Sequence, residues 1–123
     1  PMPEPISRFD ELRAQRGAVR AELDTPEDTV VVVQATRMNP WKGHRELIEA
    51  LALLRSQTPW VAWIIGGPQS PAEVEYYEGL RSLVRSRRLT ERVHLLGQRD
   101  DPRRLLAAAD IYCQANVESE GFS

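Results

Sequence analysis

The chain has 123 residues, of which 41% are hydrophobic and 28% charged, and its formal net charge is −2. A chain of this length and composition forms one domain with a core, which excludes a disordered protein, and its charge excludes the strongly basic surface of a nucleic-acid-binding protein. The single cysteine, Cys113, excludes an internal disulfide and a multi-cysteine zinc site, and no apolar run approaches the roughly 20 residues of a membrane span, so we expect a cytoplasmic protein.

The first third of the chain predicts one helix followed by one buried strand. Residues 8–23 have a helical composition, with Phe9, Leu12, Val19 and Leu23 near one face, and this stretch is too polar for a signal peptide. A continuous β-branched run then begins a strand that we expect over residues 29–35. Because the run lacks polar alternation, it is typical of a strand covered on both faces, as in a parallel sheet.

The remaining chain alternates between helical and strand patterns. We expect further strands at 61–66, 93–96 and 111–114, and helices at 44–57, 72–89 and 102–109. The residues expected to face the core of these helices are Leu47, Leu51 and Leu54, then Tyr77, Leu80 and Val84, then Leu105, Leu106 and Ala109. Asp101 precedes Pro102, an arrangement typical of a helix N-cap. The order predicts an α/β fold, a Rossmann-like doubly wound parallel sheet with right-handed crossovers.

Open parallel sheets bind ligands beyond the carboxyl ends of their strands. The segment after the first predicted strand carries Arg37 and Lys42, and Lys42 is the one lysine among the 16 basic residues. Two cations beside a helix N-terminus favour an anion such as a phosphate group. The alternative is a solvated loop that happens to contain two basic residues.

The other strand ends carry weaker signals. Gly66 and Gly67 allow a close approach of the backbone to a ligand, but glycines also simply turn chains, and no dinucleotide fingerprint is present. His44 and His94 are the only histidines, and we expect both, like Cys113, to serve the fold rather than chemistry. We therefore expect no metal and no other cofactor.

Several short motifs, in this order and spacing, resemble one family. The chain is similar to the donor-binding domain of the glycosyl transferases group 1 superfamily, whose members have the GT-B fold. The motifs that carry the resemblance are Arg37 with Lys42-Gly43, Leu47-Ile48-Glu49-Ala50, Ile64-Ile65-Gly66-Gly67, Val93-His94-Leu95-Leu96-Gly97, Ala108-Ala109-Asp110-Ile111-Tyr112 and Glu120-Gly121-Phe122-Ser123. The resemblance covers the chain from about Ile6 to Ser123.

The resemblance implies a role for each matching position. Arg37 and Lys42 would hold the diphosphate of a nucleotide-sugar donor, and Glu120 would act at the transferred sugar, which makes these three the expected catalytic residues. The other expected donor-binding residues are Gly66, Gly67, Gly97, Gln98, Arg99, Gly121, Phe122 and Ser123. No metal is implied. Many members have glycine where this sequence has Thr36.

The resemblance also implies a domain organisation. Residues 1–123 would be part of a C-terminal donor-binding lobe, with the N-terminal acceptor domain, the end of this lobe and the second glutamate of the paired motif all outside the chain. We therefore expect a fragment of a retaining, metal-independent glycosyltransferase that is inactive alone and needs its missing lobe. Its substrate would be a nucleoside-diphosphate sugar, and its acceptor, base and sugar are not encoded here.

Two alternatives stay open at this stage. The chain is also compatible with a non-catalytic nucleotide- or partner-binding doubly wound α/β module, because fold alone does not imply function. The basic stripe of Arg81, Arg85 and Arg88, beside Arg87, is compatible with peripheral contact at the inner face of a membrane. Of these two interpretations of the stripe, we favour a solvated helix face with arginines near its C-terminus.

Overall fold

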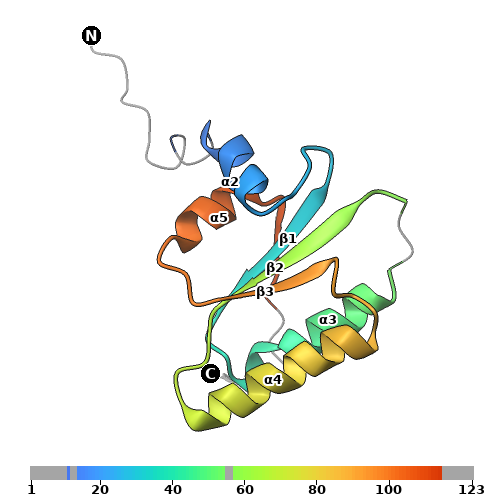
Figure 1. The fold of residues 1–123 in the computed structure, drawn as a ribbon, viewed down its shortest axis with the longest axis vertical. Coiled ribbons are helices and arrows are strands. Elements are labelled where there is room, and N and C mark those ends of the chain that lie inside the picture. Colours follow the sequence, from blue (N-terminus) through green and yellow to red (C-terminus); the bar gives the residue numbers. More distant parts are fainter. Residues whose placement is uncertain (1–10, 12–13, 55–56, 115–123) are drawn as a thin grey trace.

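The computed structural model describes residue 11, residues 14–54 and residues 57–114, and Figure 1 shows how these segments fold. Their elements follow in the order α2 Arg16–Glu22, β1 Val30–Ala35, the short 3-10 helix η1 Pro40–Lys42, α3 His44–Ala52, β2 Trp60–Ile65, α4 Pro71–Ser86, β3 Val93–Gly97, α5 Pro102–Ala108 and β4 Ile111–Tyr112. Strands and helices therefore alternate after α2.

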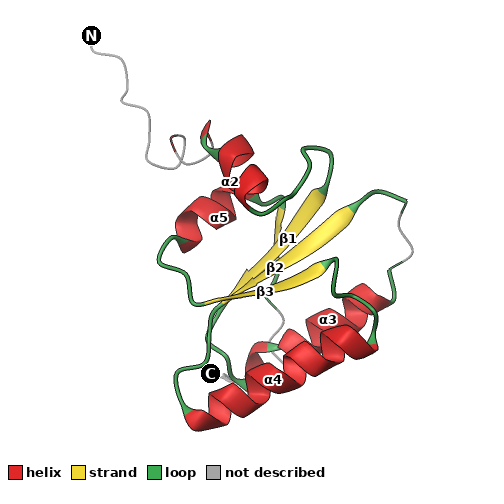
Figure 2. Ribbon diagram, in the orientation of Figure 1, coloured by secondary structure: helices red, strands yellow, loops and turns green. Residues whose placement is uncertain are grey.

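The four strands form one sheet in the order β3-β2-β1-β4, and all three strand pairs are parallel. This confirms the predicted α/β fold. In Figure 2, α3 and α4 cover one face of the sheet, and α2 and α5 cover the other. Parallel neighbours require crossover connections, and α3, α4 and α5 each supply one between two successive strands.

Side chains alternate across β1 and β2, which explains why neither strand has a polar face. Val31 and Val33 of β1 and Trp63 of β2 pack on the α2/α5 side and are at most 1% exposed. Their sequence neighbours pack on the α3/α4 side, namely Val30, Val32, Ala62 and Ile64. Successive residues of a strand point to opposite faces, so a strand covered on both sides requires a continuous apolar run.

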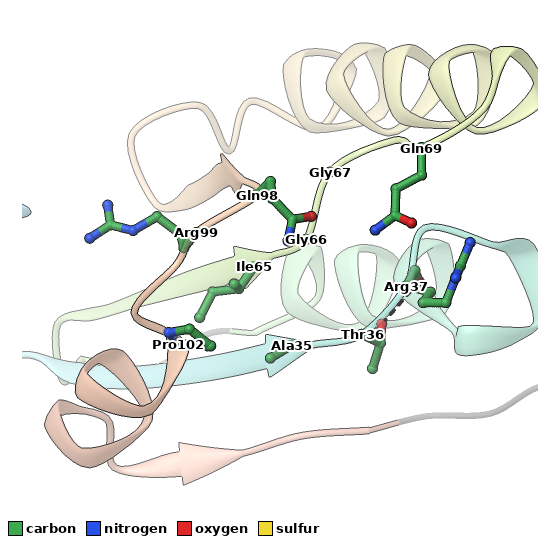
Figure 3. Close-up of a pocket in the computed structure, with 10 residues that line it drawn as sticks. All are labelled: Ala35, Thr36, Arg37, Ile65, Gly66, Gly67, Gln69, Gln98, Arg99 and Pro102. Carbon is green, nitrogen blue, oxygen red and sulfur yellow. Dashed lines mark hydrogen bonds between the residues drawn. The ribbon is translucent and has the colours of Figure 1, made fainter.

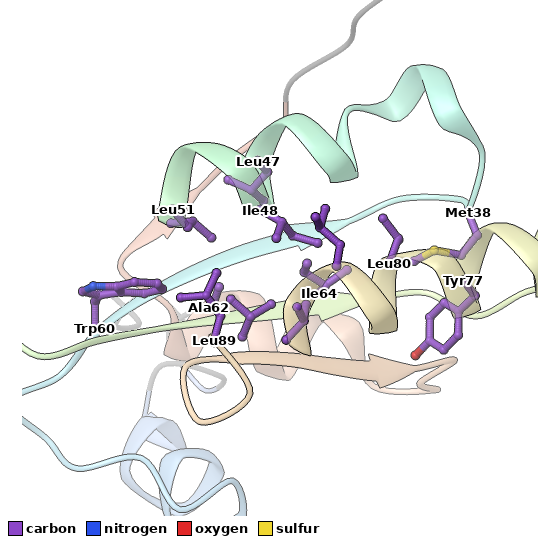
Figure 4. Packing of buried hydrophobic residues seen from close by; sticks show 13 residues of the cluster. Met38, Leu47, Ile48, Leu51, Trp60, Ala62, Ile64, Tyr77, Leu80 and Leu89 are labelled. Carbon is purple, nitrogen blue, oxygen red and sulfur yellow. The ribbon is translucent and has the colours of Figure 1, made fainter. Parts of the chain in front are cut away.

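The apolar core beneath α3 and α4 is drawn in Figure 4. Ile48 of α3, Ile64 of β2 and Leu80 of α4 are fully buried there. Burying a side chain of this size stabilises the folded state by about 1.5–3 kcal/mol relative to exposing it. This core fixes both helices against the sheet, and with them the loops that leave β1 and β2.

The helix after β1 is shorter than predicted, because α3 ends at Ala52 rather than at residue 57. The amides of Leu53 and Leu54 bond three residues back instead of four, so the last turn tightens, and Leu54 is 45% exposed. The prediction that Leu54 faces the core is therefore wrong, since it extended the helical period beyond the helix. The buried residues of this face are Leu47, Ile48 and Leu51.

The long helix α4 covers residues 71–86 instead of the predicted 72–89. Its predicted inward residues are confirmed, since Tyr77, Leu80 and Val84 are at most 5% exposed. Arg88 follows the helix with a φ of 61°, and the Leu89 amide donates to the Val84 carbonyl at 2.9 Å. A left-handed residue with such a backward bond closes a helix and turns the chain toward β3.

The last described elements differ from the prediction in burial. α5 ends at Ala108, and its buried residues are Leu105, Ala107 and Ala108, whereas the predicted Leu106 and Ala109 are half-buried. The fourth strand spans two residues, Ile111 and Tyr112, which are 50% and 53% exposed. The fourth strand predicted over 111–114 is confirmed but shorter, and it is half exposed because β4 lies at an edge of the described sheet. Cys113 follows it, half-buried.

The helix predicted over 8–23 is tested at residue 11 and from residue 14 onward, where α2 spans Arg16–Glu22. Val19 of α2 is fully buried and Leu23 half-buried, as expected, whereas Phe9 and Leu12 lie outside the described residues. None of the helices in the described ranges is both long and apolar enough to cross a membrane.

Candidate functional site

A pocket of about 230 Å³ opens at the carboxyl ends of β1, β2 and β3. The strand register brings these ends level, because Ala35 pairs with Ile65, and Ile65 pairs with Gly97. Figure 3 shows the lining residues, which are Ala35, Thr36, Arg37, Ile65, Gly66, Gly67, Gln69, Gln98, Arg99 and Pro102. This is the edge at which parallel sheets bind their ligands.

Two glycines allow the three loops of the pocket to pack closely. Gly66 has a φ of 129°, and a Cβ added there would collide with the carbonyl oxygen of Thr36. A Cβ added to Gly67 would lie 2.9 Å from the amide nitrogen of Gln98. The Gly66 amide also donates to the Gly97 carbonyl at 2.9 Å. Any side chain at position 66 or 67 would therefore push these loops apart.

Arg37 follows β1 and lies in the wall of the pocket. Its side chain is 60% exposed, and one guanidinium nitrogen lies 3.2 Å from Oε2 of Glu73 in the first turn of α4. A guanidinium has five N–H donors. The bond to Glu73 therefore leaves donors that can meet an anion in the pocket.

Glu73, which holds Arg37, is a residue that the sequence pattern left unassigned. Its Oε1 accepts a hydrogen bond from the Gln69 amide at 2.9 Å, and its own amide donates to Ser70 Oγ at 3.2 Å. The Gln69 bond, and then Arg37, outweigh burial and hold the pKa of the Glu73 carboxyl below its ordinary value. The spacing from Ser70 to Glu73 is that of a capping box, and this was the signal available in the sequence.

Lys42 lies in the same loop as Arg37 but not in the lining of the pocket. It ends η1, and its ammonium group forms no ion pair with any residue in the described ranges. Its carbonyl oxygen accepts a hydrogen bond from Gln34 Nε2 at 2.9 Å. The structure thus places both cations in the loop of residues 36–43, with Arg37 at the pocket wall.

Arg99 also lines the pocket, but its charge is already matched. Two of its nitrogens bond the two carboxylate oxygens of Asp101 at 2.8 and 2.9 Å, and its guanidinium points away from Arg37 in Figure 3. Asp101 also accepts a bond from Arg104 at 3.1 Å, and the bond from Arg99 is the main cause of its lowered pKa.

The expected helix cap at Asp101 is therefore only half correct. Asp101 does occupy the N-cap position of α5, but its side chain makes no hydrogen bond to the backbone of the helix. A guanidinium is charged whereas a backbone amide is neutral, and the bonds from two guanidinium groups occupy both oxygens of the Asp101 carboxylate.

The other predicted residues are distributed as follows. Gln98 lines the pocket, and Gly97 ends β3 with a φ of 76°. His94 lies in β3, and His44 begins α3, as expected. The remaining predicted site residues lie outside the described residues, namely Glu120, Gly121, Phe122 and Ser123.

The arginines of α4 lie apart from this site. Arg81 and Arg85 line a second pocket, of about 410 Å³, between α4 and the outer strand β3. Arg81 lies 3.4 Å from Glu78, and Arg87 bonds Glu49 at 2.7 Å. Arg81 of the predicted stripe is therefore paired with a carboxylate, and so is Arg87 beside it.

Comparisons with known sequences point to one family. The sequence pattern described as glycosyl transferases group 1 matches residues 15–123. The chain is 36% identical over 98 residues to the lipopolysaccharide core biosynthesis glycosyltransferase LpsE of Rhizobium meliloti (strain 1021), covering 79% of this chain and 26% of that protein. It is 39% identical over 93 residues to the D-inositol 3-phosphate glycosyltransferase of Jonesia denitrificans, covering 72% of this chain and 21% of that protein.

Solved structures share the fold. The crystal structure of Anabaena Alr3699/HepE in complex with UDP-glucose superposes with a TM-score of 0.77 at 30% identity, covering 89% of this chain and 29% of that one. WaaG, a glycosyltransferase involved in lipopolysaccharide biosynthesis, gives a TM-score of 0.75 over 96% of this chain and 31% of its own, and at 21% identity this likeness concerns the fold alone. The chain thus spans about a quarter of the length of the relatives it matches.

Proposed function

The chain belongs to the glycosyl transferases group 1 family, and from this premise we propose that it is the donor-binding part of a retaining glycosyltransferase that uses a nucleoside-diphosphate sugar. Its parallel α/β domain matches one lobe of the GT-B glycosyltransferases. In this proposal residues 1–123 belong to the C-terminal lobe, and an N-terminal lobe of the longer protein supplies the acceptor site.

The observation that carries the proposal is the position of Arg37. Its guanidinium has unused N–H donors and lies in the wall of a pocket that contains Gly66 and Gly67. This pocket opens at the carboxyl edge of a parallel sheet. Bidentate, charge-assisted hydrogen bonding makes arginine well suited to phosphate groups. A diphosphate in this pocket would reach Arg37 directly, and Lys42 would add its charge from the same loop.

The size of the pocket supports a shared site. Its volume of about 230 Å³ is smaller than the roughly 300–1,000 Å³ of most small-molecule sites. A nucleotide sugar would therefore need further walls, which a second lobe and residues 120–123 would provide.

The residues fit the chemistry of glycosyl transfer. In the reaction the bond between the anomeric carbon and the diphosphate oxygen breaks, and its electron pair leaves with the nucleoside diphosphate. The acceptor hydroxyl oxygen bonds to the anomeric carbon, and its proton passes to the oxygen of the departing diphosphate. Arg37 and Lys42 would stabilise the negative charge that grows on the leaving diphosphate, which is electrostatic catalysis without a side-chain nucleophile.

Calorimetric titration of the full-length protein with UDP, GDP and ADP tests the proposal. UDP is the first ligand to use, because the Anabaena relative was crystallised with UDP-glucose. Charge-assisted hydrogen bonds to phosphate contribute about 1.5–3 kcal/mol each, so Arg37→Ala and Lys42→Ala should each weaken binding by about ten- to a hundredfold.

Arg87→Ala is the matched control. Arg87 is also a surface arginine paired with one glutamate, but it joins α4 to α3 and does not line the pocket. Its loss should leave nucleoside-diphosphate affinity unchanged. Absence of binding by the parent protein, or equal affinity in the parent, Arg37→Ala and Lys42→Ala, would reject the proposed site.

A further inference from the structure

The loop of residues 36–43 follows β1 and carries both Arg37 and Lys42. Beneath it lies a fully buried histidine, His44, which begins α3. Burying an imidazole in a core is costly unless its nitrogens are hydrogen-bonded. A leucine would fill comparable space without this cost, so packing alone does not account for a histidine at this position.

Both imidazole nitrogens of His44 have partners, and these lie on two other segments. Nε2 lies 3.1 Å from Oγ1 of Thr36, the first residue of the loop and part of the pocket lining. Nδ1 lies 3.0 Å from the hydroxyl of Tyr76 on α4, and the two rings meet edge to face with centroids 5.6 Å apart. His44 therefore joins the loop to a helix that the core holds in place.

The protons can be assigned from the network itself. The Thr36 hydroxyl donates its one proton to the carbonyl oxygen of Arg37 at 3.2 Å, a bond drawn in Figure 3. Oγ1 must then accept from His44, so Nε2 carries the imidazole proton, and Nδ1 accepts from the Tyr76 hydroxyl. The result is a chain of three hydrogen bonds, Tyr76 to His44 to Thr36 to Arg37, which ends on the backbone of Arg37.

The charge state of these groups fits this chain. Burial lowers the pKa of His44 from 6.5 to about 4, against a smaller opposing effect of the Glu46 carboxylate. Burial also raises the pKa of Tyr76 to about 12. At neutral pH the imidazole therefore keeps one donor and one acceptor, and the phenol keeps its proton.

The far end of the loop is held in a similar manner. Gln34, fully buried in β1, donates from Nε2 to the Lys42 carbonyl at 2.9 Å. The backbone at Lys42 is thus held by the buried Gln34, and the backbone at Arg37 by Thr36, whose hydroxyl is bonded to the buried His44.

We propose that His44 is a positioning residue of the nucleoside-diphosphate site, acting through Thr36 to hold the backbone of Arg37 where its guanidinium meets the diphosphate. This inference rests on the proposed function. It assigns His44 no contact with the donor and no proton transfer.

Three substitutions of His44 separate this role from a structural one. The amide nitrogen of a glutamine reaches about as far as Nε2, so His44→Gln keeps the bond to Thr36. The amide of an asparagine corresponds to Nδ1, so His44→Asn keeps a bond toward Tyr76 and loses the one to Thr36. His44→Leu loses both. We expect His44→Gln to bind UDP within about threefold of the parent, and His44→Asn and His44→Leu to bind about tenfold more weakly.

Ile48→Ala is the control for stability. Ile48 lies in the same helix, is equally buried, and contacts the apolar core. Its truncation should lower the melting temperature at least as much as His44→Leu while leaving UDP affinity unchanged. Binding of uridine, which lacks phosphate groups, should be the same in all five proteins.

Coupling to Thr36 provides a second test that does not depend on any single variant folding well. Thr36→Val should weaken UDP binding, and adding His44→Leu to it should weaken binding no further, because both changes break the same chain. If His44→Leu binds UDP like the parent, or if affinity follows melting temperature through all variants including Ile48→Ala, the inference is wrong. If the parent fails to bind any nucleoside diphosphate, the proposed function fails first and the inference falls with it. If Arg37→Ala weakens binding and His44→Leu does not, the inference alone fails.

Discussion

The two faces of the sheet bury polar side chains in different ways. On the α2/α5 face, Arg20 is 1% exposed. Its guanidinium donates hydrogen bonds to the carboxylate of Asp110 and to the carbonyls of Pro26, Thr29 and Ala108. On the α3/α4 face, the buried His44 is uncharged at neutral pH.

Arg37, in the wall of the pocket, also differs from Arg20. Arg37 is 60% exposed and has one described side-chain partner, Glu73, whereas every nitrogen of Arg20 is bonded. An arginine whose donors are all used inside the protein holds the fold together. An arginine with unused donors beside a pocket is available to a ligand. This comparison separates structural from functional charge within one small domain.

The largest expected effect is on the structural side. Arg20→Met keeps the apolar stem but removes the charge, so the carbonyls of Pro26, Thr29 and Ala108 and the carboxylate of Asp110 each lose their hydrogen bond from Arg20. Hydrogen bonds made by a charged group contribute about 1.5–3 kcal/mol each, so losing several together should lower the free energy of unfolding by about 3–5 kcal/mol. Denaturant unfolding followed by tryptophan fluorescence should show a loss of this size.

Arg16→Met is its matched control. Arg16 bonds the same carboxylate of Asp110, at 2.7 Å, but is 26% exposed. Partly exposed pairs contribute roughly 0–1 kcal/mol, so this change should be several times milder. Equal losses in the two variants would contradict the distinction between the two arginines.

The second-largest expected effect is a decrease of about 3 kcal/mol in the free energy of unfolding at acid pH, which comes from His44 on the α3/α4 face. The pKa of His44 is about 4 in the folded protein and 6.5 in the unfolded chain, so the unfolded chain takes up the proton first as pH falls. The free energy of unfolding should therefore decrease between pH 6.5 and pH 4 by about 3 kcal/mol from this group. His44→Gln should lack this decrease when the two proteins are unfolded in parallel, and the same decrease in both would be evidence against a buried neutral imidazole.

On the α2/α5 face, we expect the free energy of unfolding to decrease at a lower pH, through Asp110. Burial works against ionisation of Asp110, but bonds from Arg16, the Val31 amide and Arg20 together hold its pKa below its ordinary value of 3.8. The stability that this carboxylate contributes is present above pH 3.8 and is lost as pH falls through its folded pKa. The two faces thus occupy separate pH windows.

The smallest expected effect on stability is that of replacing Arg37. Arg37→Ala removes one ion pair of an exposed side chain, so the free energy of unfolding should change by less than about 1 kcal/mol. The same variant is expected to lose nucleoside-diphosphate affinity. A decrease of about 2 kcal/mol or more in the free energy of unfolding would mean that Arg37, like Arg20, holds the fold together.

The sequence predicted the features that depend on neighbours in the chain. The β-branched run of β1, the positions of the helices and the convergence of the strand ends all follow from local pattern and the rules of parallel sheets. The error at Leu54 has a local cause too, since the period continued in sequence after the helix had ended.

Features that depend on distant residues escaped prediction. Arg37 and Glu73 are 36 positions apart, and His44 and Tyr76 are 32 apart. Neither pair follows from spacing along the chain, because α4 meets the loop after β1 only once the sheet has formed. At Asp101, two nearby arginines competed with the helix amides, and sequence pattern does not rank such competitors.

A structure of the full-length protein with UDP is the most direct test of the central claim. The account predicts the diphosphate in the pocket at the ends of β1, β2 and β3, with phosphate oxygens within hydrogen-bond distance of the Arg37 guanidinium. A diphosphate bound instead between α4 and β3 beside Arg81 and Arg85, with Arg37 still bonded to Glu73 alone, would contradict it.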